Sequence, residues 1–319
     1  RDRYLMPGLS DMHVILPSPR DSDQLVEDQM FLYLANNITV VRGARGTPNH
    51  LSLKRRIRDG QLLGPTLYVG SPPLTAANSQ DYEATIELML SHRSSGYDFQ
   101  VVHQGVPLTT WDSLAEEAHS RGYSFGGLIP DSVGLRYALA TGVSYVDHLD
   151  GYLPEVVSDE IRGRLEAGEY VALPDMLGSA VGRKMRAMAA HTRSSDTWVV
   201  PTLYLWENLY HSLDADSMLA LEEMQYVPMD LRRSWANQVL GGAPESPETA
   251  ELLVEVRQEI FRALVMSGAG VLSGTYSPQL FNVPGFSLRH ELESMAAAGL
   301  TPYEVLAATT RNAAKYALR

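Results

Sequence analysis

The sequence predicts an α/β fold, a (β/α)8 barrel of the TIM type, and three observations lead to this prediction. Eight short apolar runs alternate along the chain with longer amphipathic stretches. The chain has 319 residues, a usual length for one such barrel and long for a single β-sandwich. Hydrophobic residues make up 45% and charged residues 20% of it, as in globular proteins. A doubly wound parallel sheet is the alternative that this pattern leaves open.

The apolar runs have the length and composition of buried strands in a parallel sheet. We expect strands at residues 4–16, 38–42, 66–70, 99–103, 124–129, 145–149, 198–204 and 271–276. Because a helical stretch follows each run, neighbouring strands should be parallel.

The helical stretches place apolar residues at helical spacing. After the first strand, Val26, Met30, Tyr33 and Leu34 fall at positions i, i+4, i+7 and i+8, which is one face of a helix. Further helices are expected at residues 51–59, 82–92, 109–121, 132–140, 177–191, 216–239 and 288–298. Glycines follow several of these stretches, as is typical of helix C-termini.

The chain shows no sign of a second domain, so we expect a single domain over residues 1–319. The longest insertion, residues 206–247, follows the seventh strand and ends in the loop sequence GGAPESP. It should lie at the carboxyl ends of the strands, where barrel enzymes carry their active sites. The insertion is therefore a candidate lid.

Charge and composition exclude several classes of protein. A net charge of −12 without a cluster of Lys and Arg disfavours binding to nucleic acid. No apolar run reaches the roughly 18 residues that a membrane span needs, so we expect no membrane partner. The absence of cysteine excludes disulfides and thiolate metal sites. No signal peptide is visible, and we expect a cytoplasmic protein. The sequence leaves a homodimer open.

Several stretches resemble the amidohydrolase superfamily, in particular its imidazolonepropionase-like and prolidase-like branch. The stretch MPGLSDMHVIL at residues 6–16 is similar to the pattern PGLIDxHxHL of the first barrel strand. Further similar stretches follow in the family's order: TLYVGSPP (66–73), GYDF (96–99), YVDHL (145–149), VPTL (200–203), LSGT (272–275), GFSLRHEL (285–292) and AGLTP (298–302). The resemblance covers nearly the whole chain and implies the same barrel.

The family's chemistry is metal-assisted hydrolysis, with ligands on several strands. The resemblance implies ligand positions at residues 13, 15, 101, 128, 148 and 276. His13 and His148 are histidines as in the family. The other four positions hold Ile15, Val101, Leu128 and Tyr276, which leaves too few donors for zinc. His103 lies two residues after Val101 and is the one candidate replacement.

We therefore expect a degenerate metal site, with no metal and no other cofactor. The family usually also has a small β-sandwich, built from segments that flank the barrel. Because this sequence starts at the first barrel strand and ends after the last helix, we expect the sandwich to be missing or not included.

The remaining polar residues predict acid–base chemistry. We assign catalytic roles to His13, His148 and Tyr276, because histidine exchanges protons near neutral pH and tyrosine stabilises developing charge on oxygen. The predicted substrate-binding residues are Ile15, Arg42, Val101, His103, Leu128 and Tyr204. This set suits a largely apolar small molecule held by a few polar groups.

The leading hypothesis is a metal-independent enzyme for a small, largely apolar organic molecule. Cyclase, dehydratase, isomerase or pericyclase chemistry all fit, and natural-product biosynthesis is a plausible setting. One alternative is a non-catalytic, ligand-binding pseudo-hydrolase, since a fold can outlive its chemistry. Another is a residual hydrolase of amides, esters or lactones. Ligand affinity or a partner complex without turnover would indicate the first alternative. Cleavage of an amide, ester or lactone that responds to zinc or to a chelator would indicate the second.

Overall fold

The computed structural model describes residues 5–210, 215–242 and 246–317. Its eight strands are β1 (Leu9–Val14), β2 (Ile38–Gly43), β3 (Thr66–Val69), β4 (Gln100–Val102), β5 (Phe125–Gly127), β6 (Tyr145–Asp147), β7 (Trp198–Val200) and β8 (Gly270–Val271). They occur where the apolar runs predicted strands, but most are shorter than the runs. The first strand begins at Leu9, and residue 4, where it was expected to begin, lies outside the described residues. The seventh strand ends at Val200, before a helix that starts at Leu203.

All strand pairs are parallel, as the alternation with helices predicted. They form one sheet of order β1-β2-β3 and another of order β4-β5-β6-β7-β8. Backbone hydrogen bonds also join the edges of the two sheets. The Met12 amide donates to the Ser273 carbonyl over 2.8 Å, and single parallel bridges connect Gly70 with Phe99 and Leu74 with Val102. The fold is therefore mixed α/β with parallel sheets.

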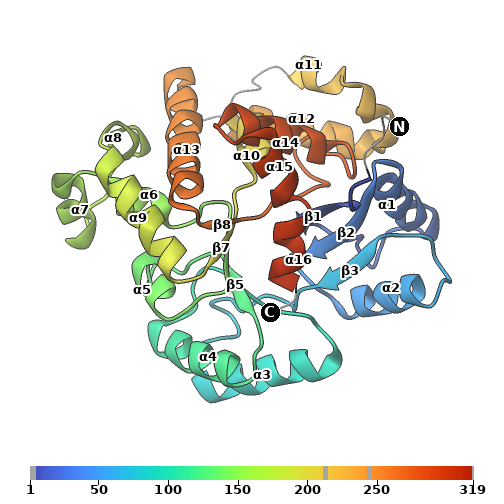
Figure 1. Ribbon diagram of the computed structural model, residues 1–319, viewed down its shortest axis with the longest axis horizontal. Helices are drawn as coiled ribbons and strands as arrows, with labels where there is room; N and C mark the ends of the chain where they lie inside the picture. The colour runs from blue at the N-terminus through green and yellow to red at the C-terminus, as the bar shows by residue number, and fades with distance from the viewer. Residues whose placement is uncertain (1–4, 211–214, 243–245, 318–319) are drawn as a thin grey trace.

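Helices lie around the outside of the two sheets (Figure 1). Up to β7 they are α1 (Asp23–Ala35), α2 (Pro48–Arg58), α3 (Tyr82–Ser95), α4 (Leu108–Ser120), α5 (Leu135–Ala140), α6 (Tyr152–Val156), α7 (Asp159–Glu166), α8 (Leu173–Gly178) and α9 (Gly182–Ser194). After β7 come α10 (Leu203–Tyr210), α11 (Ala215–Leu219), the 3-10 helix η1 (Glu222–Tyr226), α12 (Met229–Gly242), α13 (Pro247–Ser267), α14 (Ser287–Ala297), α15 (Pro302–Ala308) and α16 (Arg311–Ala317). None of the helices in the described part combines the length and apolar character needed to cross a bilayer.

After β7 one helix prediction was wrong, and α13, α15 and α16 were not predicted. The single helix expected at residues 216–239 is divided into α11, η1 and α12. The break before α12 follows from Pro228, which has no amide hydrogen and restricts the residue before it. The long helix α13 was not predicted, although its end signals are in the sequence. Ser246 caps the Thr249 amide, Pro247 occupies the first turn, and Gly268 ends the helix at φ 78°.

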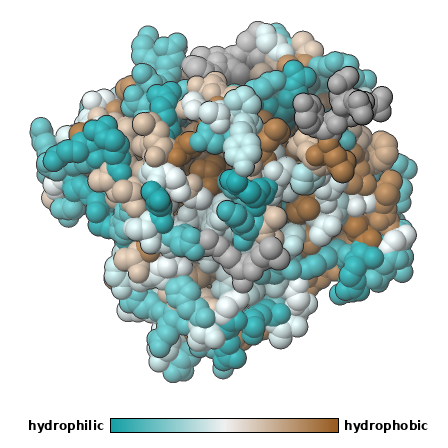
Figure 2. Space-filling view, in the orientation of Figure 1, coloured by the Kyte–Doolittle hydropathy of each residue, from teal (hydrophilic) through white to brown (hydrophobic). Residues whose placement is uncertain are grey.

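The interior contains two kinds of packing. Aliphatic and aromatic side chains fill the space between strands and helices, with Trp111 and Phe125 stacked edge to face. A second cluster lies between the sheets and includes Met12, Phe99 and Tyr145. Tyr316 of α16 packs against Tyr145 at 6.1 Å between ring centroids, and α16 lies near the middle of the view in Figure 1. On the face shown in Figure 2, apolar side chains form separate patches among hydrophilic ones.

Candidate active site

Three aromatic side chains that the sequence analysis assigned to catalysis lie together at the carboxyl ends of the strands. His13 is on β1, His148 follows β6, and Tyr276 follows β8. The ring centroids of His13 lie 4.6 Å from those of both His148 and Tyr276, and the latter two are 4.8 Å apart. The Tyr276 amide donates to the His13 carbonyl, which fixes the loop after β8 against β1. Side chains from three distant parts of the chain thus form one cluster.

His13 is held by a carboxylate. Its Nδ1 lies 3.0 Å from Oδ1 of Asp147, and both side chains are almost completely buried. Burial alone would raise the pKa of Asp147, but His13 and the nearby guanidinium of Arg42 hold this pKa below its ordinary value. An ionised carboxylate only accepts hydrogen bonds, so this ion-pair contact favours the proton on Nδ1 of His13. Among the described residues, Nε2 of His13 has no hydrogen-bond partner, and the contact of Nδ1 with Asp147 is close in distance but lies outside ideal hydrogen-bond geometry.

The hydrogen bonds of His148 fix its tautomer as well. Its Nδ1 lies 2.7 Å from the Thr202 hydroxyl, and that hydroxyl donates its proton to the Pro201 carbonyl. Because a hydroxyl has one proton, Nδ1 of His148 must be the donor, and Nε2 carries the lone pair. Burial and the neighbouring His13 lower the pKa of His148 from 6.5 to about 3. The ring is therefore neutral at physiological pH.

Tyr276 is half-buried and contacts Arg45 through its hydroxyl. Burial raises the pKa of Tyr276 above its usual value, and the hydrogen bond from Arg45 opposes this effect in part. Arg45 can only donate, so the phenol keeps its own proton for another partner. Tyr276 is thus a neutral hydrogen-bond donor beside the two imidazoles.

The backbone is strained where these side chains are attached. His148 has φ 61°, Tyr276 has φ 57° and Thr202 has φ 49°. Residues with side chains rarely adopt these angles, and a β-branched residue such as Thr202 does so least of all. Strained residues of this kind cluster at functional sites, because the surrounding structure must hold them in place. The strain marks the ends of three neighbouring strands.

Two adjacent cavities adjoin the cluster. A small inner cavity of ≈ 30 Å³ is lined by His13, Ala44, Arg45, Val101, Val102, His103, Gly127, Leu128, Asp147, His148 and Tyr276. A larger outer pocket of ≈ 540 Å³ shares Leu128, His148 and Tyr276 with it. The rest of the outer wall is mainly apolar and comes from the segments after β6, β7 and β8, including Leu149, Leu153, Met176, Leu205, Trp206 and Leu280. A volume of this size suits a small organic molecule.

The structure brings together only some of the predicted substrate-binding residues. Val101, His103 and Leu128 line the inner cavity with the catalytic candidates. Burial, and then Arg45, lower the pKa of His103. Tyr204 was expected on the seventh strand but lies on α10, where its ring stacks on His290 at 4.7 Å.

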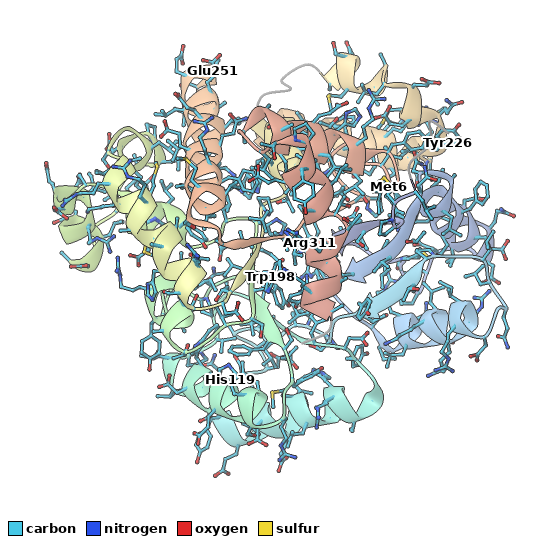
Figure 3. The ribbon with its side chains drawn as sticks, viewed as in Figure 1. Met6, His119, Trp198, Tyr226, Glu251 and Arg311 are labelled. Atoms are coloured by element: carbon cyan, nitrogen blue, oxygen red, sulfur yellow. The ribbon has the colours of Figure 1, made fainter. Side chains whose placement is uncertain are left out.

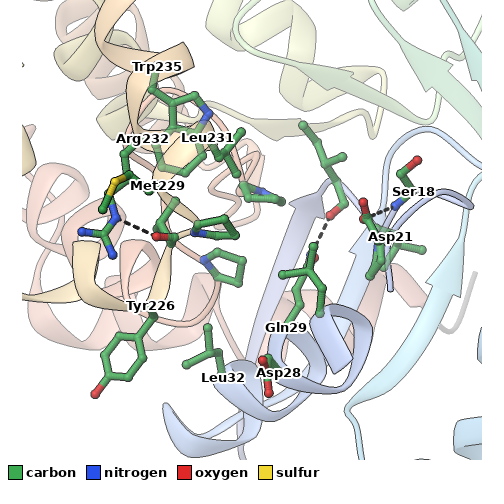
Figure 4. Close-up of a pocket in the computed structure, with 18 of the residues that line it drawn as sticks. Ser18, Asp21, Asp28, Gln29, Leu32, Tyr226, Met229, Leu231, Arg232 and Trp235 are labelled. Carbon is green, nitrogen blue, oxygen red and sulfur yellow. Dashed lines mark hydrogen bonds between the residues drawn. The ribbon is translucent and has the colours of Figure 1, made fainter. Parts of the chain in front are cut away.

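Ile15 and Arg42 are also separate from these cavities. Arg42 is only 1% exposed and lies deeper, between the rings of Phe99 and Tyr145. Ile15 lines a different apolar pocket of ≈ 570 Å³ between α1 and the segment from η1 to α12 (Figure 4). In this pocket Gln29 donates to the Ile15 carbonyl over 3.0 Å, and Trp235 forms part of the opposite wall.

A further cavity of ≈ 680 Å³ lies at the amino ends of β7 and β8. Trp198 and Arg311 line it and are labelled near the centre of Figure 3. It shares no lining residue with the two cavities beside His148. The candidate active site is therefore confined to the carboxyl ends of the strands.

The residues at the site do not fit a catalytic metal. Within residues 5–210, 215–242 and 246–317, no group of three His, Cys, Asp or Glu side chains is arranged to hold an ion. Val101 and Leu128 are apolar where the resemblance implies ligands. One nitrogen of His13 and one of His148 are already engaged, with Asp147 and Thr202. We therefore derive no chemistry through a metal.

Sequence reasoning missed the partners of the catalytic candidates: Asp147, Thr202 and Arg45. Asp147 could have been found, because it directly precedes His148 and shares the inward face of its strand with Tyr145. Thr202 and Arg45 gave no sequence signal, because the backbone turns after the strands decide where their side chains lie. Arg257 was missed too. It comes from α13, donates to the His148 carbonyl and stacks over Trp206 at 4.1 Å.

Comparison with solved structures identifies proteins that share this fold. The chain is similar to bottromycin amidohydrolase, with a TM-score of 0.75 and 22% identity over 98% of this chain and 67% of that one. It is also similar to a Xaa-Pro dipeptidase (TM-score 0.62, 14% identity, 98% and 75% covered) and to ochratoxinase from A. niger (TM-score 0.60, 14% identity, 98% and 71% covered). No protein-family model and no curated protein sequence matches this chain. The fold is amidohydrolase-like, as the sequence resemblance implied.

Proposed function

We propose that this amidohydrolase-like chain is a metal-independent enzyme that moves protons on a small, largely apolar organic molecule. The carrying observation is the cluster of His13, His148 and Tyr276, whose ring centroids lie within 4.8 Å of each other. His148 and Tyr276 line the apolar outer pocket, and His13 lines the inner cavity that adjoins it. Isomerisation, dehydration and ring closure share the step that this cluster suits, which is removal of a proton next to a carbonyl group.

In the proposed step His13 is the general base. Its Nε2 takes the proton from carbon, and the electron pair of the broken C–H bond moves toward the carbonyl oxygen. The Tyr276 hydroxyl donates a hydrogen bond to that oxygen as negative charge develops on it. Asp147 stabilises the imidazolium of His13 that results. His148 stays neutral and offers Nε2 as an acceptor for a substrate hydroxyl or for the returning proton.

The outer pocket indicates the class of substrate. Its wall is mainly aliphatic, so an apolar body of the size of a small ring system gains most from burial there. Two carboxylates, Asp131 and Asp150, and one cation, Arg257, also line it. Burial raises the pKa of Asp150 to about 6. We propose a substrate with one or two polar groups on an apolar framework, of the kind that natural-product pathways process.

The finer architecture belongs to the same proposal. We propose that the two sheets form one closed (β/α)8 barrel, which the hydrogen bonds between β1 and the segment after β8 support. The insertion at residues 206–247 would act as a lid, since Trp206 and Leu209 line the outer pocket. Residues 211–214 and 243–245 of it lie outside the described residues. A single domain in the cytoplasm, alone or as a homodimer, fits this reading.

A residual hydrolase is the second candidate, and the inner cavity favours it. A space of ≈ 30 Å³ between His13, Asp147 and His103 has room for one water molecule. The His13–Asp147 pair could take a proton from such a water during attack on an ester or amide carbonyl. The two candidates differ in their products, because hydrolysis adds the elements of water and isomerisation does not.

The test uses 2-tetralone, a small apolar ketone, in D2O. Exchange of its α-protons is followed by NMR for the wild-type chain and for H13A, H148A and Y276F. We expect each variant to lose about tenfold or more of the rate, as for loss of a general acid or base. H191A is the matched control, because His191 lies on α9 away from the site. Exchange no faster than with free imidazole would contradict the proposal, and release of phenol from phenyl acetate would favour the hydrolase.

A further inference from the structure

Arg42 is a cation enclosed in the interior of the protein. The side chain is 1% exposed, and its guanidinium carbon lies 4.0 Å from the ring centroid of Phe99 and 3.8 Å from that of Tyr145. Tyr316 of α16 faces it at 5.4 Å. Aromatic faces attract a guanidinium and fix the plane in which it lies. The orientation of the group is therefore set by packing.

Two polar contacts of this guanidinium lead to the catalytic candidates. Its Nη1 donates to the Met12 carbonyl over 3.0 Å, which is the peptide group that joins Met12 to His13. The same nitrogen lies 3.8 Å from Oδ1 of Asp147, the oxygen that faces Nδ1 of His13 at 3.0 Å. Arg42 thus contacts both the backbone and the carboxylate that position the His13 ring.

A purely structural role explains this arrangement poorly. Nε and Nη2 of Arg42 have no hydrogen-bond partner among the described residues, and buried unsatisfied donors are destabilising. An apolar side chain of similar volume often stabilises an interior better than a buried ion pair. What such a residue could not supply is a fixed positive charge beside Asp147. The contact with Asp147 is therefore the part of the arrangement that an apolar residue would lose.

We propose that Arg42 is a positioning residue of the candidate active site. It holds the Asp147 carboxylate beneath His13, so that the imidazole keeps its proton on Nδ1 and presents Nε2 to the substrate. Arg42 acts through Asp147 and does not touch the substrate, in contrast to the substrate-binding role that the sequence suggested. The inference rests on the proposed function for its catalytic meaning, but the geometry that it predicts can be measured without a substrate.

The first experiment records ¹⁵N NMR spectra of the His13 ring in the wild-type chain and in R42M. We expect His13 to be fixed as the Nδ1–H tautomer in the wild type and to become a mixture of tautomers in R42M. R42K keeps the charge and should retain the wild-type signature in large part. The proposal is overturned if wild-type His13 carries its proton on Nε2, or if folded R42M gives the wild-type signature.

A stability effect is separated from positioning by two further variants. M89A removes a fully buried side chain of α3 in the outer core, so it should lower stability while leaving the His13 signature unchanged. R42Q keeps an N–H donor for the Met12 carbonyl without the charge, and it takes the place of R42M if that variant does not fold. A wild-type signature in folded R42Q overturns the proposal in the same way.

The rate of 2-tetralone exchange then links position to catalysis. We expect R42M to lower the maximal rate about tenfold with little change in the half-saturating concentration, because the pocket wall is untouched. An unchanged rate in R42M despite an altered His13 signature would overturn the catalytic part of the inference. If the wild type shows no exchange at all, the proposed function fails, and the NMR result still decides whether Arg42 positions His13.

Discussion

The neutral, buried state of His148 has a direct consequence for stability at different pH values. In the unfolded chain this histidine titrates with its ordinary pKa of 6.5, whereas in the folded chain the pKa is lowered to about 3. Between these values the unfolded chain binds a proton that the folded chain does not. The free energy of unfolding must therefore fall as the pH falls through this window. We compare the wild type with H148N, which keeps a donor for Thr202 but does not titrate.

The magnitude follows from the width of the window. One pH unit corresponds to about 1.4 kcal/mol for a single group. At about pH 5, protonation of His148 in the unfolded chain lowers the free energy of unfolding by about 2 kcal/mol. Below about pH 3 the full decrease is about 5 kcal/mol. At about pH 7.5 the contribution is close to zero, because both states are then unprotonated.

Urea unfolding at about pH 7.5 and pH 5 measures this effect. The other titrating groups, among them Asp11 and Glu291, with pKa values raised by burial to about 7 and about 8, are common to both proteins and cancel in the difference. We expect the wild type to lose about 2 kcal/mol more than H148N between the two pH values. An equal loss in both proteins would refute the assignment of His148 as a neutral acceptor.

Three further predictions concern the stability of the fold and the metal content of the protein. D98A should cost about 2–3 kcal/mol in urea unfolding, because Asp98 accepts hydrogen bonds from Lys54 at 2.6 Å and from the Val69 amide. A loss below about 0.5 kcal/mol would contradict this. G126A should cost about 1–3 kcal/mol, since an added Cβ would lie 2.2 Å from the Tyr145 carbonyl oxygen. A melting temperature equal to that of the wild type would contradict it. Protein from zinc-supplemented cultures should hold less than roughly a tenth of an equivalent of any transition metal by mass spectrometry. One or two equivalents would instead require a ligand set that includes His103.

The order and the type of the strands could be predicted from the sequence because both depend on local patterns. Apolar runs identify buried strands, and each expected strand contains or overlaps an observed one. Segment ends were less predictable, since they depend on tertiary contacts. A helix begins at Leu203, inside the seventh run, because Glu291, distant in sequence, accepts hydrogen bonds from the Leu203 and Tyr204 amides. No pattern within residues 198–204 indicates that contact.

The site was predictable in part for the same reason. The resemblance to the first and sixth strands of the amidohydrolases indicated His13 and His148, and their closeness follows from the parallel order of the strands. The alternation of side chains along β2 predicts that Arg42 faces inward, as a pocket residue would. The large rings packed around its guanidinium place it deeper, in the interior. Its place in the interior was therefore invisible in the sequence.

The apolar residues at the positions where the resemblance implies ligands affect the neighbouring polar groups. Val101 and Leu128 line the inner cavity and leave little room for water around His13 and Asp147. Water screens charges strongly, so its exclusion strengthens the attraction between the carboxylate and the imidazole. The same dry surroundings disfavour a positive charge on His148. The apolar lining therefore keeps His148 neutral beside the His13–Asp147 pair.

A site that served packing alone would pair every polar atom in it or hold an apolar side chain instead. Here each catalytic candidate has one partner and keeps one further hydrogen-bond donor or acceptor. The pairs are His13 with Asp147, His148 with Thr202, and Tyr276 with Arg45. The available atoms are two imidazole lone pairs and one phenol proton, which are two acceptors and one donor beside an apolar pocket. Proton transfer needs such a combination, and packing alone gives no reason for it.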